Sequence, residues 1–463
     1  MSKQNVIVIF DVGKTNKKIF LFDEQYHILS EESKMLEETK DEDGFACEDL
    51  QALTKWILEN FRKISSHADF NLRALSFSAY GASLVHLDDT HQPLTPLYSY
   101  LKPYPENLKK LFYDTYGGES LIAKQTASPV LGSLNSGMQL YRLKYEQPKI
   151  FSGLKYSLHL PQYLNFVVSS RTVSDITSVG CHTQLWDFKK NKYHHWVYAE
   201  GLCTKLAPIY RGDKIVSIPN HTGNIAIGIG LHDSSAALIP YLKLFQEPFI
   251  LLSTGTWCIS LNPFNYSSLT DYELQNDCLC YLTYQGKPVK ASRLFAGNEH
   301  EEQIKKLADH FNKDVNYYKT VVYDDSSLKK LQRMNIVNQL SSNTAMVQRS
   351  AFGERSLSNF ETYEEAYHQL MLDIMTQQVH STKLVLSGTP VQKIFVDGGF
   401  GKNDVYMHLL AISFPHIKVY AANISQASAL GAALALHDHL SKNNLPSNII
   451  ELKYYAVKND LVI

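Results

Sequence analysis

The sequence predicts an α/β protein with two domains. Its 463 residues exceed what one ordinary hydrophobic core accommodates. Short apolar runs rich in β-branched residues alternate with longer stretches of helical periodicity, which is typical of sheets covered by helices. A strand–turn–strand pattern around Gly13 recurs around Gly255, about half a chain length later. We therefore expect domains 1–246 and 247–463, with their boundary near residues 246–248, although two unrelated hairpins would give the same pattern.

The first half opens with a predicted hairpin. Val6–Phe10 is apolar, β-branched and followed by Asp-Val-Gly, which indicates a buried strand. Lys18–Phe22 follows after a short polar stretch and predicts the return strand. Apolar residues recur at helical spacing over 50–64, and residues 73–77 predict another strand.

The second half repeats this opening. Residues 248–252 form an apolar run, residues 253–256 a polar turn with one glycine, and residues 257–261 a second run. Tyr363–Leu386 has helical periodicity and Gly388 follows it, as at many helix ends.

The last predicted elements are a strand and a helix. Lys393–Val396 reads as a strand that runs into a glycine-rich turn. Residues 427–440 are rich in alanine and predict a final helix, with Ser425 as a candidate cap and Gly431 allowing close packing.

Composition excludes several classes of protein. The net charge is −1, and no dense Lys/Arg cluster is present, which argues against a nucleic-acid partner. The apolar run at residues 6–10 is too short for a signal-peptide core or a membrane span, so we expect a cytoplasmic protein. The six cysteines are scattered, which argues against a disulfide framework. Cys278 and Cys280 lack a second pair at zinc-site spacing.

Two polar turns could hold phosphates. The first follows Asp11 and contains Gly13, Lys14, Thr15, Asn16 and Lys17; glycine lets backbone N–H groups approach a phosphate, and the side chains add donors. Asp11, at the strand end, could hold Mg²⁺ through water. The second turn contains Thr254, Gly255 and Thr256. The alternative for each is a polar turn that binds no phosphate. The prediction of phosphate binding depends on the two turns occurring at matching places in the two halves.

A glycine-rich turn follows the strand at residues 393–396. Gly398, Gly399 and Asn403 could let a flat base or ribose lie against the backbone. The alternative is a tight turn between a strand and a helix.

The pair His232-Asp233 lies among small residues at a predicted helix start. Phosphoryl transfer to a hydroxyl uses a carboxylate within hydrogen-bond reach of that hydroxyl. Asp233 could instead be a helix N-cap, a common role for aspartate.

Taken together, these stretches resemble the FGGY family of carbohydrate kinases, in the actin-like ATPase superfamily. The resemblance covers nearly the whole chain in the same order. It includes 11–16, 80–83, 160–164, 174–178, 232–233, 253–256 and 397–399. It implies two ribonuclease-H-like domains with ATP and sugar in the cleft between them.

The resemblance also implies roles for individual residues. Asp11 would be the Mg²⁺-associated acid and Asp233 the catalytic base. The first phosphate loop would be 13–17 and the second 254–256, and Gly398, Gly399 and Asn403 would form the adenosine site. Gly81, Ala82, Asp175 and His232 would lie on the sugar side with Asp233.

The implied activity is ATP- and Mg²⁺-dependent phosphorylation of a ketose. His232-Asp233 is similar to rhamnulose kinases, which favours a 6-deoxy-ketulose such as L-rhamnulose or L-fuculose. A xylulose, ribulose or polyol kinase, or a degenerate regulator that binds nucleotide and sugar, is the alternative. Lys14 departs from the usual Thr or Ser, and residues 293–299 match no subgroup. A monomer or homodimer without a membrane partner is expected.

Overall fold

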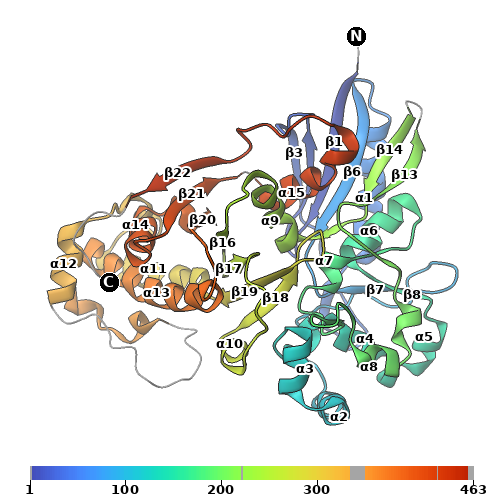
Figure 1. Cartoon of the computed structure of the whole chain (residues 1–463), viewed down its shortest axis with the longest axis horizontal. Coiled ribbons are helices and arrows are strands. Elements are labelled where there is room, and N and C mark those ends of the chain that lie inside the picture. The colour runs from blue at the N-terminus through green and yellow to red at the C-terminus, as the bar shows by residue number, and fades with distance from the viewer. Residues whose placement is uncertain (1–2, 221–222, 334–349, 425, 457–463) are drawn as a thin grey trace. The chain divides into compact units, whose positions relative to one another are not determined.

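The computed structural model describes residues 3–220, 223–333, 350–424 and 426–456 (Figure 1). The chain forms two compact units. Unit 1 comprises Met1–Phe245, Cys280–Pro288 and Ser425–Ile449, and unit 2 comprises Gln246–Leu279, Val289–Ile424 and Ile450–Ile463. Two short segments from the second half of the chain therefore pack into the unit that the first half builds.

A mixed sheet forms the centre of unit 1. Its strand order is β13-β14-β6-β1-β2-β3, and β15 also pairs with β6. The strands are β1 (Gln4–Val12), β2 (Lys17–Phe22), β3 (Ile28–Lys34), β6 (Phe70–Ala79), β13 (Ile215–Asn220), β14 (Gly223–Gly228) and β15 (Leu231–His232). Strand β1 is antiparallel to β2 and parallel to β6, and β15 is also parallel to β6. The carboxyl ends of β1, β6 and β15 therefore meet at one edge.

Helices cover this sheet on both sides (Figure 1). Helix α1 (Leu50–Ser65) begins at Asp49, whose side chain accepts a hydrogen bond from the N–H of Ala52. It packs with α6 (Leu160–Ser169) against β6. On the other side, α15 (Ala427–Ala435) contacts β1, β6 and α9 (Asp233–Leu244). The buried face of β1, which includes Val6, Val8 and Phe10, anchors the core of this layer.

Unit 1 carries a second, smaller core. Phe112, Tyr141 and Trp196 pack edge to face at its centre. Its helices are α2 (Glu106–Tyr116), α3 (Glu119–Thr126), α4 (Ser136–Glu146), α5 (Pro148–Gly153), α7 (Ile176–Val179) and α8 (His195–Ala199). Its short strands are β7 (Leu84–Leu87), β8 (Tyr156–His159), β9 (Ser174–Asp175), β10 (Trp186–Asp187), β11 (Lys192–Tyr193) and β12 (Ile209–Tyr210). The pair β4 (Glu38–Lys40) and β5 (Ala46–Glu48) completes the unit's strands, and α16 (His437–Leu440) follows α15.

The sheet in unit 2 repeats the arrangement of unit 1. Its order is β18-β19-β17-β16-β20-β21-β22. Strand β16 is antiparallel to β17 and parallel to β20, as β1 is to β2 and β6. The strands are β16 (Phe249–Thr254), β17 (Cys258–Asn262), β18 (Cys278–Leu282), β19 (Pro288–Leu294), β20 (Lys393–Gly398), β21 (Lys418–Asn423) and β22 (Glu451–Tyr455). This recurrence agrees with the internal repeat expected from the sequence.

The helices of unit 2 bury one continuous core. They are α10 (Asp271–Gln275), α11 (Ala296–Phe311), α12 (Asp325–Arg333), α13 (Tyr363–Leu386) and α14 (Asp404–Ser413). The long helix α13 packs against α11, α12, α14 and β17. Tyr363, Tyr367 and Leu370 on this helix are buried in that core.

Most elements predicted from the sequence lie where they were expected. The predicted final helix is one exception, because it ends at Ala435 and a separate short helix begins at His437. Ser425, its predicted cap, lies outside the described residues, and Gln426 occupies the cap position with a φ of 58°. Among the residues that the structure describes, no helix is both long enough and apolar enough to cross a membrane.

Gly431 brings α15 against α9. A Cβ atom at this position would lie 1.8 Å from the carbonyl oxygen of Ala236, a backbone atom that cannot rotate away. We therefore expect Gly431→Ala to destabilise unit 1 by about 3 kcal/mol or more, at the upper end of overpacking costs. Gly153→Ala is the control, because a Cβ there meets no atom within 4 Å. Urea unfolding of both variants measures the difference, and equal stabilities would refute the close contact.

Candidate active site

Asp11 lies at the sheet edge where three parallel strands end. In the register, Asp11 of β1 is opposite Ser78 of β6, and Ser78 is opposite Leu231 of β15. Burial raises the pKa of the Asp11 carboxyl from 3.8 to about 6, and the nearby charge of Asp233 adds to this rise. Ser428, in the first turn of α15, donates a hydrogen bond of 2.9 Å to Asp11 Oδ2. This hydrogen bond lowers the pKa of Asp11 and so partly offsets the rise. No sequence pattern points to Ser428, which is 417 positions from Asp11.

Asp233 occupies the first turn of α9, two residues beyond the strand partner of Ser78. Its Oδ1 accepts hydrogen bonds from the N–H of Ser234 at 2.6 Å and from its hydroxyl at 3.2 Å. Surrounding protein raises the pKa of the carboxyl to about 6, although 38% of the side chain stays accessible to solvent. His232 occupies the N-cap position without a side-chain capping hydrogen bond, and Asp233 is the first residue of the helix rather than its cap.

His232 lies behind Asp233 in an enclosed position. Its Nε2 is 3.2 Å from Asp233 Oδ1 and 3.1 Å from the Sγ of Cys181. Its ring stacks on Tyr281, with 5.7 Å between centroids. Burial lowers the pKa of the imidazole to about 3, so the ring is neutral at physiological pH. A Cβ atom on Gly81 would lie 2.8 Å from His232 Cδ2, so the glycine leaves room for this ring.

Asp175 holds the backbone at His232. Its Oδ1 accepts hydrogen bonds from the N–H and hydroxyl of Thr177 and from the N–H of Ser178, which caps α7. The Thr177 hydroxyl oxygen in turn accepts a hydrogen bond of 3.0 Å from the N–H of His232. Burial raises the pKa of Asp175 to about 7. The structure thus connects Asp175 with the His232-Asp233 pair through Thr177, rather than by direct contact.

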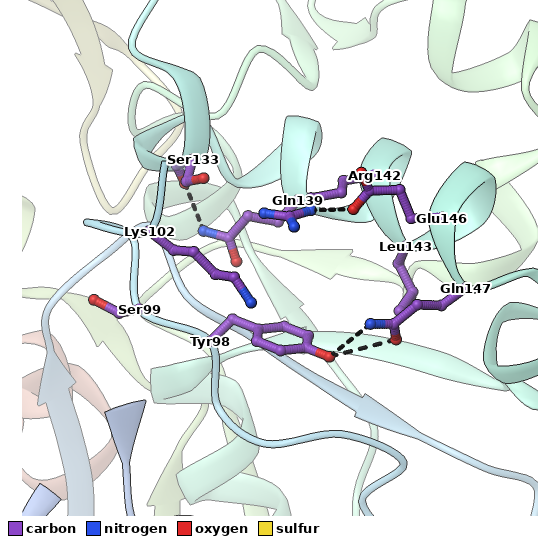
Figure 2. Close-up of a pocket in the computed structure, with 9 residues that line it drawn as sticks. All are labelled: Tyr98, Ser99, Lys102, Ser133, Gln139, Arg142, Leu143, Glu146 and Gln147. Carbon is purple, nitrogen blue, oxygen red and sulfur yellow. Dashed lines mark hydrogen bonds and ion pairs between the residues drawn. The ribbon is translucent and has the colours of Figure 1, made fainter. Parts of the chain in front are cut away.

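The loop at Gly81 and Ala82 is held in place by a hydrogen bond from a buried glutamine. Ala82 is buried with a φ of 63°, and its carbonyl accepts a hydrogen bond of 2.6 Å from Gln139 Nε2. Gln139 also donates to the carbonyl of Ser133. Figure 2 shows the contact between Gln139 and Ser133 beside a small pocket, which is lined by Tyr98, Ser99, Lys102, Ser133, Gln139, Arg142, Leu143, Glu146 and Gln147. The cations of that pocket pair with carboxylates, as Lys102 does with Asp41.

The first predicted phosphate loop is a tight hairpin turn. The N–H of Gly13 donates to the carbonyl of Asn16 at 2.9 Å, and Thr15 and Asn16 are exposed at the tip. Lys14 is partly exposed and pairs with Glu38. These residues present polar groups to solvent, as phosphate binding requires.

Lys17 has a different position from the one the sequence suggested. Its side chain is 1% exposed and forms an ion pair with the buried Glu48. Its Nζ also donates to the carbonyls of Gly13 and Lys14 at 3.2 and 3.0 Å. An ammonium has three N–H donors, so these contacts leave none for a phosphate. Lys17 therefore stabilises the turn through its hydrogen bonds to the backbone.

The second predicted loop joins the glycine-rich turn in unit 2. Thr254 donates its hydroxyl to the carbonyl of Asp397, and its hydroxyl oxygen accepts a hydrogen bond of 3.0 Å from the N–H of Phe400. Gly398 has a φ of 81°, and a Cβ there would lie 1.8 Å from the carbonyl oxygen of Thr254. Gly255 and Thr256 are exposed beyond this junction.

A cavity of about 520 Å³ adjoins these turns. It is lined by Gly255, Gly297, His300, Tyr318, Lys319, Val321, Val322, Gly399, Phe400, Lys402, Asn403 and Asp404. Asn403 caps α14 and donates a hydrogen bond of 2.6 Å to the hydroxyl of Tyr367. Bare backbone at the glycines beside aromatic rings suits a flat heterocycle. Two of the three residues predicted for the adenosine site, Gly399 and Asn403, thus line one cavity with Gly255, whereas Gly398 is not among its lining residues.

The segment 293–299 supports the second loop. A Cβ atom on Gly297 would lie 1.8 Å from the carbonyl oxygen of Gly255, and the N–H of Asn298 donates to the carbonyl of Thr256 at 3.1 Å. The guanidinium of Arg293 lies 5.4 Å from the ring of Trp257 in the same turn. The segment that matched no subgroup in the sequence therefore fixes the backbone of this turn.

Comparisons with known proteins identify the family. The model for the FGGY family of carbohydrate kinases, N-terminal domain, matches residues 6–239, and the model for the carbohydrate kinase FGGY, C-terminal domain, matches residues 246–444. The chain belongs to the FGGY family of carbohydrate kinases and is thus a phosphotransferase that acts on a sugar hydroxyl.

Individual relatives are distant. A rhamnulokinase from Halalkalibacterium halodurans is 22% identical over 78% of this chain and 79% of its own length. A carbohydrate kinase from Novosphingobium aromaticivorans has a similar structure, with a TM-score of 0.81, 22% identity and coverage of 98% of this chain and 95% of that chain. The structure of a Plasmodium falciparum glycerol kinase with ADP is also similar, with a TM-score of 0.74 and 17% identity. The match covers 96% of this chain and 91% of that chain. These structural similarities establish the actin-like ATPase fold.

The buried pair of Lys17 and Glu48 gives a stability prediction. Lys17→Met leaves the Glu48 carboxylate without its cation, which should lower the free energy of unfolding by about 3–5 kcal/mol. Lys14→Met is the control, since its ion pair is exposed and should contribute at most about 1 kcal/mol. The double variant Lys17→Met/Glu48→Leu should recover most of the loss. Equal urea stability of the two single variants would contradict the structural role of Lys17.

Proposed function

We propose that the protein transfers the γ-phosphoryl group of ATP to a hydroxyl of a 6-deoxy-ketulose, such as L-rhamnulose or L-fuculose. The observation that carries this proposal is the arrangement of Asp233. This carboxylate has a raised pKa, stays partly accessible, and lies beside a neutral histidine in a protein that belongs to a sugar-kinase family.

Asp233 supplies the chemistry expected of a general base. With a pKa of about 6 it is mostly ionised at neutral pH, yet it is more basic than an ordinary aspartate. The transition state of phosphoryl transfer is loose, so the base mainly orients the acceptor hydroxyl and takes its proton late. The hydrogen bonds from Ser234 fix the carboxylate while it does so.

Asp11 fits a divalent cation held through water. Burial and, to a smaller extent, the neighbouring carboxylate of Asp233 raise its pKa, so negative charge is poorly compensated at this point. A Mg²⁺ ion would neutralise this charge and that of the triphosphate, for which Lys14 is the partly exposed cation of the first turn. Ser428 orients Asp11 for this role through its hydrogen bond to Oδ2.

The cavity in unit 2 is the proposed adenosine site. Gly399 and Gly255 offer bare backbone, and Phe400 and Tyr318 offer rings. The ADP that the Plasmodium glycerol kinase binds supports a nucleotide as the ligand of this fold. Thr254 and Gly398 hold the two turns together, which keeps Thr256 in place for phosphate, whereas the N–H of Gly255 donates to the carbonyl of Trp257.

The acceptor side suits a sugar with an apolar end. Tyr80 and Tyr100 lie ring to ring at 5.9 Å, and the charge of Asp233 raises the pKa of Tyr100, although burial contributes more. Tyr80 lies in the loop that follows β6, as does Ala82, which is buried. An aromatic wall near the proposed base favours the methyl group of a 6-deoxy sugar. The rhamnulokinase relative supports this class of acceptor.

Two further properties belong to the proposal. A cytoplasmic location agrees with six cysteines that all lie in the described residues and form no disulfide. A xylulose, ribulose or polyol kinase, or a regulator that binds ATP and sugar without transfer, is the alternative that the following measurements separate.

The substrate class is tested by ADP release in a coupled assay over a panel of ketoses and polyols. We expect Mg²⁺-dependent release with L-rhamnulose or L-fuculose as the best acceptor. Preference for glycerol or D-xylulose by more than tenfold in kcat/KM, or about 1.4 kcal/mol, would overturn the substrate assignment. ATP binding without release for any sugar would favour the regulator.

The base is tested by Asp233→Asn. Asparagine keeps an oxygen for the Ser234 hydrogen bonds but is a far weaker base, so turnover should fall by about 10²–10⁴. Thermal stability and ATP affinity should stay close to those of the unmodified protein. Asp49→Asn is the matched control, because this aspartate caps α1 and asparagine caps equally well. Near-normal turnover in Asp233→Asn would remove Asp233 from the reaction.

A further inference from the structure

Three potential metal ligands converge behind the proposed acceptor site. One ligand atom each from Cys181, His182 and His232 lies within 4.8 Å of the others, and all three side chains are buried in unit 1. Cys181 and His182 follow α7, whereas His232 ends β15. A thiol and two imidazoles form the donor set that soft divalent cations such as Zn²⁺ prefer.

The hydrogen bonding of His182 suits a metal ligand. Its Nδ1 is 3.1 Å from the carbonyl oxygen of Leu134, which can only accept, so Nδ1 carries the proton. The lone pair is therefore on Nε2. Metal-binding histidines usually donate their other ring N–H to a carbonyl or carboxylate in this way, which fixes the tautomer.

Asp233 lies next to this group of three potential ligands and is not a member of it. Its Oδ1 is 3.2 Å from His232 Nε2, and the same nitrogen is 3.1 Å from Cys181 Sγ. Zinc–sulfur and zinc–nitrogen bonds of about 2.3 and 2.0–2.1 Å place two tetrahedral ligands about 3.5 Å apart. The separation of Cys181 Sγ and His232 Nε2 is therefore about half an ångström shorter than in a tetrahedral site, and the other separations in the group are at most 4.8 Å, so side-chain rotations are needed to seat an ion.

We propose that Cys181, His182 and His232 form a binding site for Zn²⁺ or a similar soft cation, and that its occupation inhibits the kinase. Binding replaces the thiol proton of Cys181 with the metal, and that proton passes to solvent. The metal takes Nε2 of His232 away from Asp233, whose Oδ1 is 3.2 Å from that nitrogen. The base then loses the contact that positions it for the acceptor hydroxyl.

Mg²⁺ and Zn²⁺ would not compete for one site in this protein. Mg²⁺ prefers oxygen ligands and retained waters, which Asp11 offers, whereas thiolate and imidazole select softer ions. Inhibition by Zn²⁺ should therefore persist at saturating Mg²⁺. This inhibition rests on the proposed function, but the metal binding does not.

Binding is tested by titrating the reduced, metal-free full chain with Co²⁺. A thiolate ligand gives a near-ultraviolet charge-transfer band, and Zn²⁺ should abolish it by displacement. We expect one equivalent of this band in the unmodified protein and in Cys203→Ser, and none in Cys181→Ser. Loss of a residue that only contacts a metal ligand weakens metal binding by about 10–100-fold. His182→Ala removes a ligand and should therefore weaken Co²⁺ binding by more than this. Absence of the band, or its persistence in Cys181→Ser, would overturn the site.

Inhibition is tested by kinase rates in buffered free Zn²⁺ at saturating MgATP, with each variant normalised to its own metal-free rate. We expect reversible inhibition in the unmodified protein and in Cys203→Ser, restored by a chelator, and at least a tenfold higher inhibitory concentration for Cys181→Ser. Cobalt binding without Zn²⁺ inhibition would overturn the regulatory half of the proposal. Cobalt binding by a protein that phosphorylates no sugar would instead refute the proposed function and leave the metal site standing.

Discussion

The site in unit 1 depends on placing two carboxyl groups where their charges are poorly solvated. Asp11 and Asp233 each have a pKa of about 6, and burial is the largest cause for both. Parallel pairing of β1, β6 and β15 brings them to one sheet edge. A cation bound at this edge would offset the negative charge of the carboxylates. A carboxylate with a raised pKa is also a better proton acceptor than an ordinary one.

Much of the surrounding structure serves to hold this edge in place. The C-terminal segment returns to unit 1, where Gly431 lets α15 approach α9 and Ser428 reaches Asp11. Thr177, held by Asp175, fixes the backbone N–H of His232. Lys17 donates to the carbonyls of Gly13 and Lys14 and so supports the first turn. Backbone contacts of this kind reduce the reorganisation that catalysis would otherwise require.

The sequence predicted the parts of the fold that local patterns encode. The hairpin at residues 6–22 and the helix at Tyr363–Leu386 are continuous apolar patterns, and the structure has both. The split between α15 and α16 was missed, because alanine-rich sequence favours helix throughout and gives no signal for a break at Leu436. The family followed from several weak motifs in order, which its two domain models confirm.

Predictions for individual site residues were limited by contacts between distant positions. Lys17 looked like a phosphate ligand because its partner Glu48 is 31 positions further along and forms no motif with it. The thiol of Cys181 meets His232 across 51 positions, so cysteine spacing alone argued against any zinc site. By contrast, the place of Asp233 at a helix start was evident from the small residues that follow it.

The most direct test of the raised pKa values is a carboxyl ¹³C NMR titration of aspartate-labelled protein, free of nucleotide and divalent cations. Besides that of Asp175, which should titrate near pH 7, two resonances should titrate near pH 6, one of them absent in Asp233→Asn and the other in Asp11→Asn. In Asp233→Asn the remaining Asp11 resonance should titrate at lower pH, because the like charge that raised its pKa is gone. Titration of both carboxyls near their ordinary value of 3.8 would contradict the account of this site.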